Sequence, residues 1–425
     1  MNEFLSAREY ATQSTVLPNR NKASHQEWMS DSLARKVPYM LGESKLHLGE
    51  VDKVFASDWL SEDVVIFGTK CNQLMLYEIS SDKIVYIPLL RTAGGSNEED
   101  YFSDELISVF SPTSCGIHSV HCSPGKTKLA TSGHNPNHLA IYTLPNLDPY
   151  IIGKGHKDWI FATQWLGEKL LVTSSRDSTM ALWSVDSGQS VDQVLAESVP
   201  SMVPLCKFRN TSALNESGIK VRDLAYSSQY ANLAALQTGT CAATVHLWDC
   251  YTLQQIYRYS LPFSAENVCI EADEKLGLYA VGSRSHITFL DSRVDTKSVC
   301  SIHSKDKDSG VRSLQFNDNL ISIGTGQGNL YFYDIRTDSY LSKLEHSWSQ
   351  INIAGPSYRE PSAWVLKTTL GWLRKDETYR DFFSGMPEPP NAIYTHTYSP
   401  TKSRLFVAGG PLPLGLCGNY CALWH

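Results

Sequence analysis

The chain has 425 residues, of which 42% are apolar and 11% aromatic, so it can bury a large core and is predicted to be globular. A formal net charge of −7 disfavours direct nucleic-acid binding, and no apolar stretch approaches the roughly 18 residues that a membrane-spanning helix needs. Ten cysteines without a Cys-x-x-Cys pair, and a start without a basic region and apolar run, favour reduced thiols in the cytoplasm and nucleus.

Residues 1–42 are predicted to form an N-terminal extension with a short helix. Four apolar residues fall near helical spacing: Trp28, Met29, Leu33 and Val37. Pro38 is expected to end this helix, because proline lacks the N–H that the helix would use. The helix either docks onto a partner or packs against the rest of the chain, and the sequence favours neither.

Residues 43–425 contain seven copies of one short segment, an apolar stretch that ends in an aromatic residue or Leu and, in most copies, then Asp, Glu or Ser. The copies end at Glu78, Thr143, Ser184, Asp249, Asp291, Asp334 and His425. The steps between these ends are 65, 41, 65, 42, 43 and 91 residues, a period near 42 that three insertions interrupt. This period is typical of WD repeats. The sequence therefore predicts an all-β, seven-bladed WD-repeat β-propeller.

The last segment ends at the carboxyl terminus, which leaves room for only three strands in the seventh blade. Residues 45–48 alternate polar and apolar side chains and are predicted to add the fourth strand, which closes the ring. Insertions are expected at 92–112, 186–219 and 344–391. The first is predicted to be an acidic loop and the second a flexible one, whereas the third is rich in tryptophan and is expected to pack on a blade.

The third repeat has the clearest WD pattern. His156, a Ser or Thr, and Trp183 are predicted to form a buried hydrogen-bonded chain, with Asp177 holding the turn between the second and third strands. These three named residues are therefore interpreted as structural. No phosphate-binding loop, zinc-protease motif or serine-hydrolase motif is present, so a binding protein without catalytic residues, metal or cofactor is the stronger hypothesis.

The second residue of each inner strand is expected to face the mouth of the central channel. These residues are Phe55, His118, Phe161, Arg222, Cys269, Arg312 and Tyr394, and two arginines and a histidine among them predict a cationic opening. With neighbouring turns included, six cations are predicted to converge: Lys53, Lys70, Arg176, Arg222, Arg284 and Arg312. Such a cluster favours an anionic ligand. The alternative is that each cation pairs with a loop carboxylate such as Asp177 or Asp223.

Two successive repeats end in a box similar to Trp-Asp-x-Arg, with other apolar residues in place of Trp. The boxes span residues 290–293 and 333–336 and place Arg293, Asp334 and Arg336 just beyond a third strand. These residues are expected on the face opposite the channel mouth.

Several segments make the chain resemble the WD-repeat substrate receptors that associate with Cullin-4. They are residues 53–60, 68–72, 155–161, 324–328, 391–396 and 406–413. The resemblance implies a non-catalytic subunit of a Cullin-4 RING ubiquitin ligase, attached to the damaged-DNA-binding (DDB) adaptor protein. Five residues would contact that adaptor: Arg293, Arg336, Asp334, Trp28 and Leu33.

A member of that family binds protein carboxyl termini that end in two glutamates. The resemblance therefore implies that the six mouth cations bind such a degron. One alternative is a general WD-repeat scaffold that binds acidic or phosphorylated peptides without any ligase. Another is an enzyme built on a propeller, for which the sequence offers no catalytic set.

Overall fold

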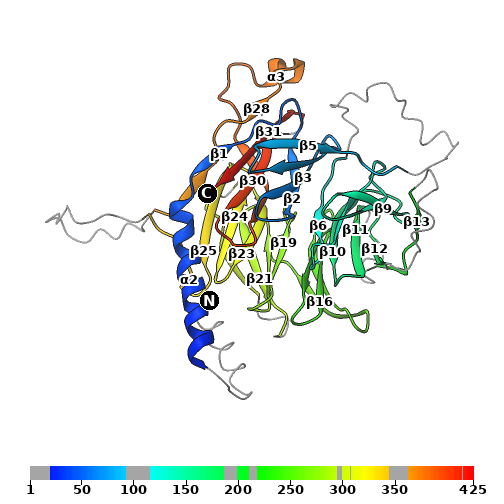
Figure 1. Ribbon diagram of the computed structural model, residues 1–425. Coiled ribbons are helices and arrows are strands. Elements are labelled where there is room, and N and C mark those ends of the chain that lie inside the picture. The colour runs from blue at the N-terminus through cyan, green and yellow to red at the C-terminus, as the bar shows by residue number, and fades with distance from the viewer. Residues whose placement is uncertain are drawn as a thin grey trace.

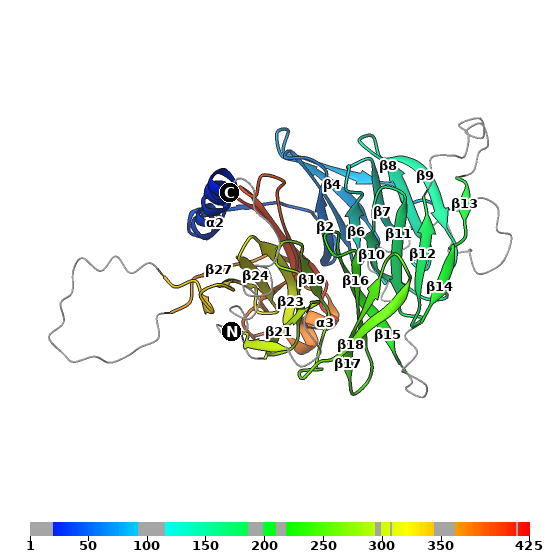
Figure 2. The same cartoon turned by 90° about the horizontal axis from the view of Figure 1, so that it is seen from below.

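The computed structural model describes residues 20–91, 115–185, 199–209, 218–293, 299–306, 308–343, 362–413 and 415–425, with side chains from residue 30 onward. Across these ranges the chain forms seven sheets, and the first strands of successive sheets contact one another in a closed cycle. The sheets surround a central channel as blades (Figure 1, Figure 2). The predicted seven-bladed β-propeller is confirmed.

Each of the first four blades is built on four strands, ordered from the channel outward. Blade 1 holds β2 (Val54–Trp59), β3 (Val64–Thr69), β4 (Leu74–Glu78) and β5 (Lys83–Ile87). Blade 2 holds β6 (Val120–Cys122), β7 (Lys128–Ser132), β8 (Leu139–Thr143) and β9 (Asp148–Gly153). Blade 3 holds β10 (Ile160–Trp165), β11 (Leu170–Ser175), β12 (Met180–Ser184) and β14 (Cys206–Phe208). Blade 4 holds β15 (Lys220–Ser227), β16 (Asn232–Thr238), β17 (Ala243–Asp249) and β18 (Gln254–Ser260).

The remaining three blades follow the same order. Blade 5 holds β19 (Ile270–Asp273), β20 (Leu278–Gly282), β21 (His286–Asp291) and β22 (Cys300–His303). Blade 6 holds β23 (Val311–Asn317), β24 (Leu320–Thr325), β25 (Asn329–Asp334) and β26 (Ser339–Tyr340). Blade 7 holds β29 (Asn391–Tyr398), β30 (Leu405–Pro411), β31 (Gly418–Trp424) and β1 (Glu43–Lys45). Three short strands add to blade edges: β13 (Ser201–Met202), β27 (Val365–Lys367) and β28 (Trp372–Leu373).

The core lies between neighbouring blades. Leu139 and Ile141 of β8, for example, pack in one buried cluster with Leu171 of β11 and Trp183 of β12. Each sheet can bury apolar side chains on both faces only because another blade stands on each side. A propeller of this kind therefore needs a closed ring, and its first and last strands must meet.

Strand β1 closes the ring by pairing antiparallel with β31. Glu43 is opposite Trp424, and Lys45 is opposite Ala422. The pairing continues through a hydrogen bond from the Leu46 N–H to the Cys421 carbonyl at 2.9 Å. The predicted closure is confirmed, although the strand begins at Glu43 rather than at residue 45. The seventh blade thus receives its outer strand from the opposite end of the chain.

Residues from two of the three expected insertions contribute strands. Residues 186–219 were expected to form a flexible loop, but β14 within them is the outer strand of blade 3, and β13 pairs with β9. In the third insertion, β27 pairs with β25 and β28 pairs with β31. A short helix, α3 (Glu377–Phe382), follows β28. The expected insertion 92–112 lies outside the described residues.

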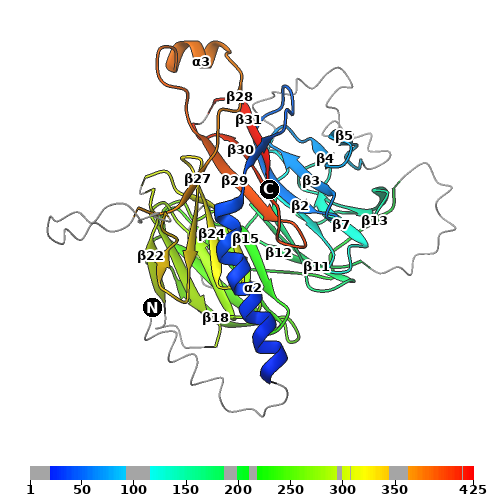
Figure 3. The same ribbon diagram turned by 60° about the vertical axis from the view of Figure 1, so that its left-hand side comes forward.

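Helix α2 (Arg20–Met40) runs along blades 6 and 7, and its N-terminal part extends beyond the strands at the end of the molecule opposite α3 (Figure 1, Figure 3). The prediction that Pro38 ends the helix is wrong, because the helix continues to Met40. Tertiary contacts hold this last turn: the Trp364 indole N–H donates to the Pro38 carbonyl at 2.9 Å, and the Tyr39 and Trp364 rings lie 5.0 Å apart.

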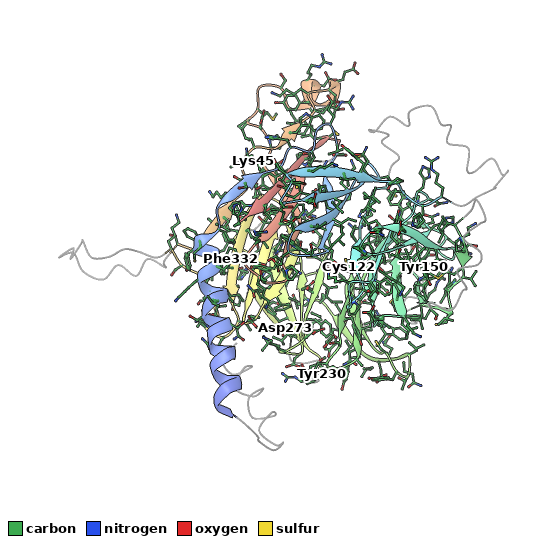
Figure 4. All side chains as sticks on the ribbon, viewed as in Figure 1. Lys45, Cys122, Tyr150, Tyr230, Asp273 and Phe332 are labelled. Atoms are coloured by element: carbon green, nitrogen blue, oxygen red, sulfur yellow. The ribbon has the colours of Figure 1, made fainter. Side chains whose placement is uncertain are left out.

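The C-terminal end of α2 packs on the propeller itself. Val37 and Leu41 belong to an apolar cluster with Leu330 and Phe332 of β25, and Phe332 lies beside α2 in Figure 4. Of the two roles left open for this helix, packing against its own chain is therefore present. Neither of the described helices is long and apolar enough to cross a membrane.

Candidate ligand-binding mouth and opposite face

A β-bulge occurs at the same position in five of the seven inner strands. The pairing register shifts between the residues on either side of Phe55, Phe161, Arg222, Arg312 and Tyr394. A bulge turns one side chain out of the ladder and re-aims it. In the other two blades, Cys269 directly precedes β19, and His118 lies two residues before β6. All seven residues line the same cavity at the channel.

This cavity, the mouth, has a volume of about 310 Å³. Besides these seven residues, its lining includes Lys53, Lys70, Asp223 and Glu271, and Leu412, which directly follows β30. Four of the six predicted cations therefore line one cavity: Lys53, Lys70, Arg222 and Arg312. Arg176 and Arg284 do not belong to its lining.

One side of the mouth is aromatic. The Phe55 ring stacks on His118 at 5.0 Å and meets Tyr394 edge-on at 5.2 Å, and Phe161 contacts the other side of His118 at 5.2 Å. Burial, with a contribution from the positive charge of Arg222, lowers the pKa of His118 to about 3. His118 is therefore neutral at physiological pH, and the expectation that it adds to the positive charge is wrong.

Arg222 differs from the other mouth cations because no carboxylate of the described residues lies within ion-pair distance of its guanidinium. The guanidinium lies over the Phe161 ring, 4.4 Å from its centre. The neighbouring Asp223 uses its carboxylate to accept hydrogen bonds from the N–H groups of Leu224 and Ile270, each at 2.9 Å. Burial raises the pKa of Asp223 to about 7 in spite of these bonds and of the charge of Arg222.

Lys53 and Lys70 share a fixed counter-ion, Asp52. Lys70 Nζ donates to Asp52 Oδ2 at 2.9 Å, and Lys53 Nζ lies 3.7 Å from Oδ1 while it donates to the Leu416 carbonyl. Asp52 also accepts from the N–H groups of Lys53 and Gly418 at 2.9 and 3.2 Å. Burial opposes ionisation of Asp52, but the two lysines and these bonds lower its pKa. Asp52 is thus a buried anion held in place by three hydrogen bonds and by the charges of two lysines.

Arg312 and Arg284 flank a second carboxylate, that of Glu266. Arg312 Nη2 lies 2.5 Å from Glu266 Oε2, and Arg284 Nε lies 3.9 Å from Oε1. On the far side of the ring, Arg176 Nε lies 3.6 Å from Asp158, and its guanidinium lies over Trp159 at 4.7 Å. Both Arg284 and Arg176 are therefore at the rim rather than in the cavity.

The alternative, that each cation pairs with a nearby loop carboxylate, holds for five of the six predicted cations among the described ion pairs, all but Arg222, although the carboxylates are not Asp177 or Asp223. The carboxylates that the sequence reasoning missed are Asp52, Asp158 and Glu266. Each of them lies within four residues before an inner strand. This shared position could have identified them from the sequence, because the loop that leads into an inner strand must pass the channel mouth.

The structure joins the residues interpreted as structural in blade 3. His156 Nε2 lies 2.6 Å from Thr173 Oγ1, which accepts a hydrogen bond from the Trp183 indole N–H at 2.9 Å. Asp177 lies 3.2 Å from His156 Nδ1 and accepts from the Lys157 N–H at 2.8 Å. Although burial works against it, these hydrogen bonds hold the pKa of Asp177 well below its usual range. This series of hydrogen bonds therefore joins the turn to the sheet.

On the opposite face, α2 contacts the turns at the far ends of the inner strands. Ser30 donates to Asp318 at 2.6 Å, and Asp31 accepts from Asn319 at 2.9 Å. Asp318 and Asn319 follow the end of β23, whereas Arg312 lies at its beginning, in the mouth. The helix and the mouth thus lie on opposite faces of the propeller.

The two Arg boxes also lie on this opposite face, and both are engaged within the chain. Arg293 pairs with Asp291 through two hydrogen bonds of 3.0 and 2.7 Å. Arg336 Nη2 lies 3.1 Å from Asp31 of α2 and keeps 56% of its side chain exposed. Asp334 is buried and pairs with Arg35 at 2.6 Å, so it supports the fold rather than a surface.

The two helix residues expected to contact an adaptor differ in what the structure describes. Leu33 is 57% exposed, as a partner-facing apolar residue would be. The side chain of Trp28 lies outside the described residues. In the part of the chain with described side chains, no group of three His, Cys, Asp or Glu residues is arranged to hold a metal ion.

A comparison with known protein families gives one match over nearly the whole chain. Residues 37–425 match the family described as "DDB1- and CUL4-associated factor 12 beta propeller". The matched region runs from the last turn of α2 through all seven blades, so it includes both the mouth and the opposite face.

Proposed function

The chain belongs to the DDB1- and CUL4-associated factor 12 β-propeller family, and from this membership we propose that it is a non-catalytic substrate receptor of a ligase built on DDB1 and CUL4. In this proposal the mouth captures a substrate, and the opposite face attaches to the DDB1 adaptor. Transfer of ubiquitin belongs to other subunits in this proposal.

We further propose that the mouth binds acidic carboxyl termini, those ending in Glu-Glu in particular. The observation that carries this proposal is Arg222, a guanidinium inside a cavity with no carboxylate of the described residues at ion-pair distance. A partly desolvated arginine gains more from an anion than an exposed one does, because less water competes for its donors. A terminal carboxylate can take two parallel hydrogen bonds from such a group.

The rest of the lining suits the same ligand. Arg312 and Lys70 lie at separate points around the cavity, so they can receive the side-chain carboxylates of the two glutamates. The aromatic side formed by Phe55 and Tyr394 offers an apolar wall for the methylene groups. Three carboxylates within two residues are found only at a chain end, which makes a terminus a better match than an internal acidic segment.

For the adaptor, the candidate surface is the opposite face. Leu33 is exposed on α2, and Arg293 and Arg336 lie beyond the third strands of blades 5 and 6. Because α2 and the mouth lie on opposite faces, a bound adaptor leaves the mouth open. This arrangement is what a receptor needs if it is to hold substrate and ligase at the same time.

The substrate part of the proposal is tested by peptide binding to the purified chain. A labelled peptide ending in Glu-Glu is compared with the same peptide carrying a carboxyl-terminal amide and with one ending in Ala-Ala. We expect measurable binding of the first and strong weakening in both controls. Equal binding of the acid and the amide would instead indicate a general scaffold for acidic peptides, and no binding of any peptide would contradict the proposal.

The variant Arg222→Glu assigns that binding to the mouth. Loss of a hydrogen bond to a charged group costs about 1.5–3 kcal/mol, so we expect affinity to fall by about 10- to 100-fold or more. The matched control is Arg176→Glu, which makes the same charge change at the rim, outside the cavity lining. We expect less than about threefold change there, because an exposed ion pair contributes little.

A further inference from the structure

The carboxylate of Glu266 pairs with Arg312, an arginine that lines the mouth and would contact the proposed ligand. This carboxylate contacts Nη2 of Arg312 at 2.5 Å, and Arg312 is only 14% exposed whereas Glu266 is 40% exposed. The backbone of Glu266 has φ +57, a conformation that non-glycine residues seldom adopt. Glu266 is not part of the cavity lining, but its carboxylate pairs with Nη2 of a lining arginine, a donor that the carboxylate of an acidic ligand would also use.

Arg312 is held in place without Glu266. Its Nε and Nη2 donate to the Ser309 carbonyl at 3.3 and 3.1 Å. Gly310, with φ +75, lets the guanidinium lie against the backbone, since a Cβ at that position would come within 3.0 Å of Nη2. Removal of Glu266 would thus leave the arginine oriented toward the mouth.

The two carboxylates that pair with mouth cations, Asp52 and Glu266, differ in how freely they can move. Asp52 is 7% exposed, accepts three hydrogen bonds and lies 3.7 Å from Lys53 Nζ, so it stays with its lysines. Glu266 is partly exposed and has a second cation, Arg284, at 3.9 Å. If Glu266 is displaced, its carboxylate can pair with Arg284 at the rim. This second pairing lowers the free-energy cost of breaking the ion pair with Arg312.

We infer that Glu266 is a specificity-determining residue of the mouth: its carboxylate competes with the ligand for Arg312 and moves to Arg284 when an acidic terminus binds. The inference rests on the proposed function of the mouth. It predicts that weakly acidic ligands are excluded, because only a ligand with several carboxylates compensates for the displaced ion pair. Arg284, which lies outside the cavity, acquires a role that works through Glu266.

The test is the dissociation constant of a peptide ending in Glu-Glu for the full chain, three single variants and one double variant at one salt concentration. Glu266→Gln removes the competitor with little change in shape. We expect affinity to rise by about two- to fivefold, the size of an exposed ion pair. Glu274→Gln makes the same charge change at the other end of β19 and is expected to leave affinity within about twofold.

The third variant tests whether Glu266 competes with the ligand for Arg312 or instead orients Arg312. Arg284→Gln is expected to weaken binding by about twofold in the wild-type chain and to have no effect when combined with Glu266→Gln. Weaker binding by Glu266→Gln would show that Glu266 orients Arg312 and would overturn the inference, as would equal gains in Glu266→Gln and Glu274→Gln. Absence of binding in both the wild-type chain and Glu266→Gln would overturn the proposed function, and this inference with it.

Discussion

Two carboxyl groups in the lining of the mouth should make ligand binding depend on pH. Burial raises the pKa of Asp223 to about 7, and burial together with the neighbouring charges of Asp223 and Asp273 raises that of Glu271 to about 8. Near neutral pH Glu271 is therefore largely protonated and Asp223 about half protonated, so the lining keeps a positive balance.

From this follows a prediction for affinity between pH 6.5 and 8.5. The carboxylates of an acetylated peptide remain ionised throughout, because their pKa values are near about 4. His118 stays neutral, and arginine stays charged. As pH rises, Asp223 and Glu271 lose protons and place negative charge beside Arg222, so affinity for the Glu-Glu peptide should fall. Glu271→Gln should flatten the upper part of the curve, whereas an unchanged slope in that variant would contradict the assignment.

Asp223 and Glu271 should also make the free energy of unfolding depend on pH. An acid whose pKa is raised by folding binds more protons in the folded than in the unfolded state between about pH 4 and its folded pKa. The free energy of unfolding contributed by Asp223 and Glu271 is therefore greatest at the acidic end of this window. It is lost as pH rises through about 7 and 8.

The sequence predicts which residues line the mouth better than it predicts which carboxylates pair with them. The seven mouth residues could be found because each occupies the same place in a repeat, and the bulges make that place face the channel. The counter-ions Asp52 and Glu266 could not be assigned in the same way. Their positions depend on where an irregular loop passes the neighbouring blade, which repeat spacing does not determine.

Among the elements, α2 is attached to blade 6 by a network of charges. Asp31 lies 3.1 Å from Arg336 and 3.6 Å from Arg35, and Arg35 lies 2.6 Å from Asp334. Arg336 was expected to contact the adaptor directly. Its contact with Asp31 suggests instead that it positions the helix, so its effect on the adaptor would be exerted through α2.

Exchanging the charges of Arg336 and Asp31 distinguishes direct contact of Arg336 with the adaptor from positioning of α2 by Arg336. Arg336→Asp places two carboxylates together and should lower the free energy of unfolding by about 1–2 kcal/mol, speed hydrogen exchange in α2 and weaken DDB1 capture. Adding Asp31→Arg should restore part of all three, because the attraction is re-formed with reversed polarity.

Arg293→Asp serves as the matched control, because Arg293 pairs with Asp291 and not with the helix. It should leave exchange in α2 unchanged. If the double variant regains slow exchange but still fails to capture DDB1, then Arg336 contacts the adaptor itself and the positioning role is contradicted.

The regular elements follow from the sequence, and the exceptions have physical causes. Inner strands and the closing segment carry strong alternation, so their places could be predicted. Strand β14 has three residues and little pattern of its own, and it forms because β12 presents an open edge. Helix α2 continues past Pro38 because Trp364, far along the chain, supports its last turn.

The whole molecule combines a closed ring with two faces, to which the proposed function assigns the ligand and the adaptor. Strand β1 joins the end of α2 to the last blade, so the element that packs on the opposite face also completes the sheet cycle. The mouth, lined from all seven blades, keeps its shape only while this cycle is closed. Family membership accounts for the adaptor side of the proposal, and the geometry of Arg222 carries the ligand side.

A bridging experiment tests most directly whether one chain holds adaptor and substrate together. The full chain is captured on immobilised DDB1, and a labelled peptide ending in Glu-Glu is then titrated onto it, beside its amide and beside captured Arg222→Glu. We expect the captured chain to bind the acid peptide as tightly as the free chain does, and both controls to fail. Mutual exclusion of DDB1 and peptide, or equal binding of acid and amide, would contradict the proposed function.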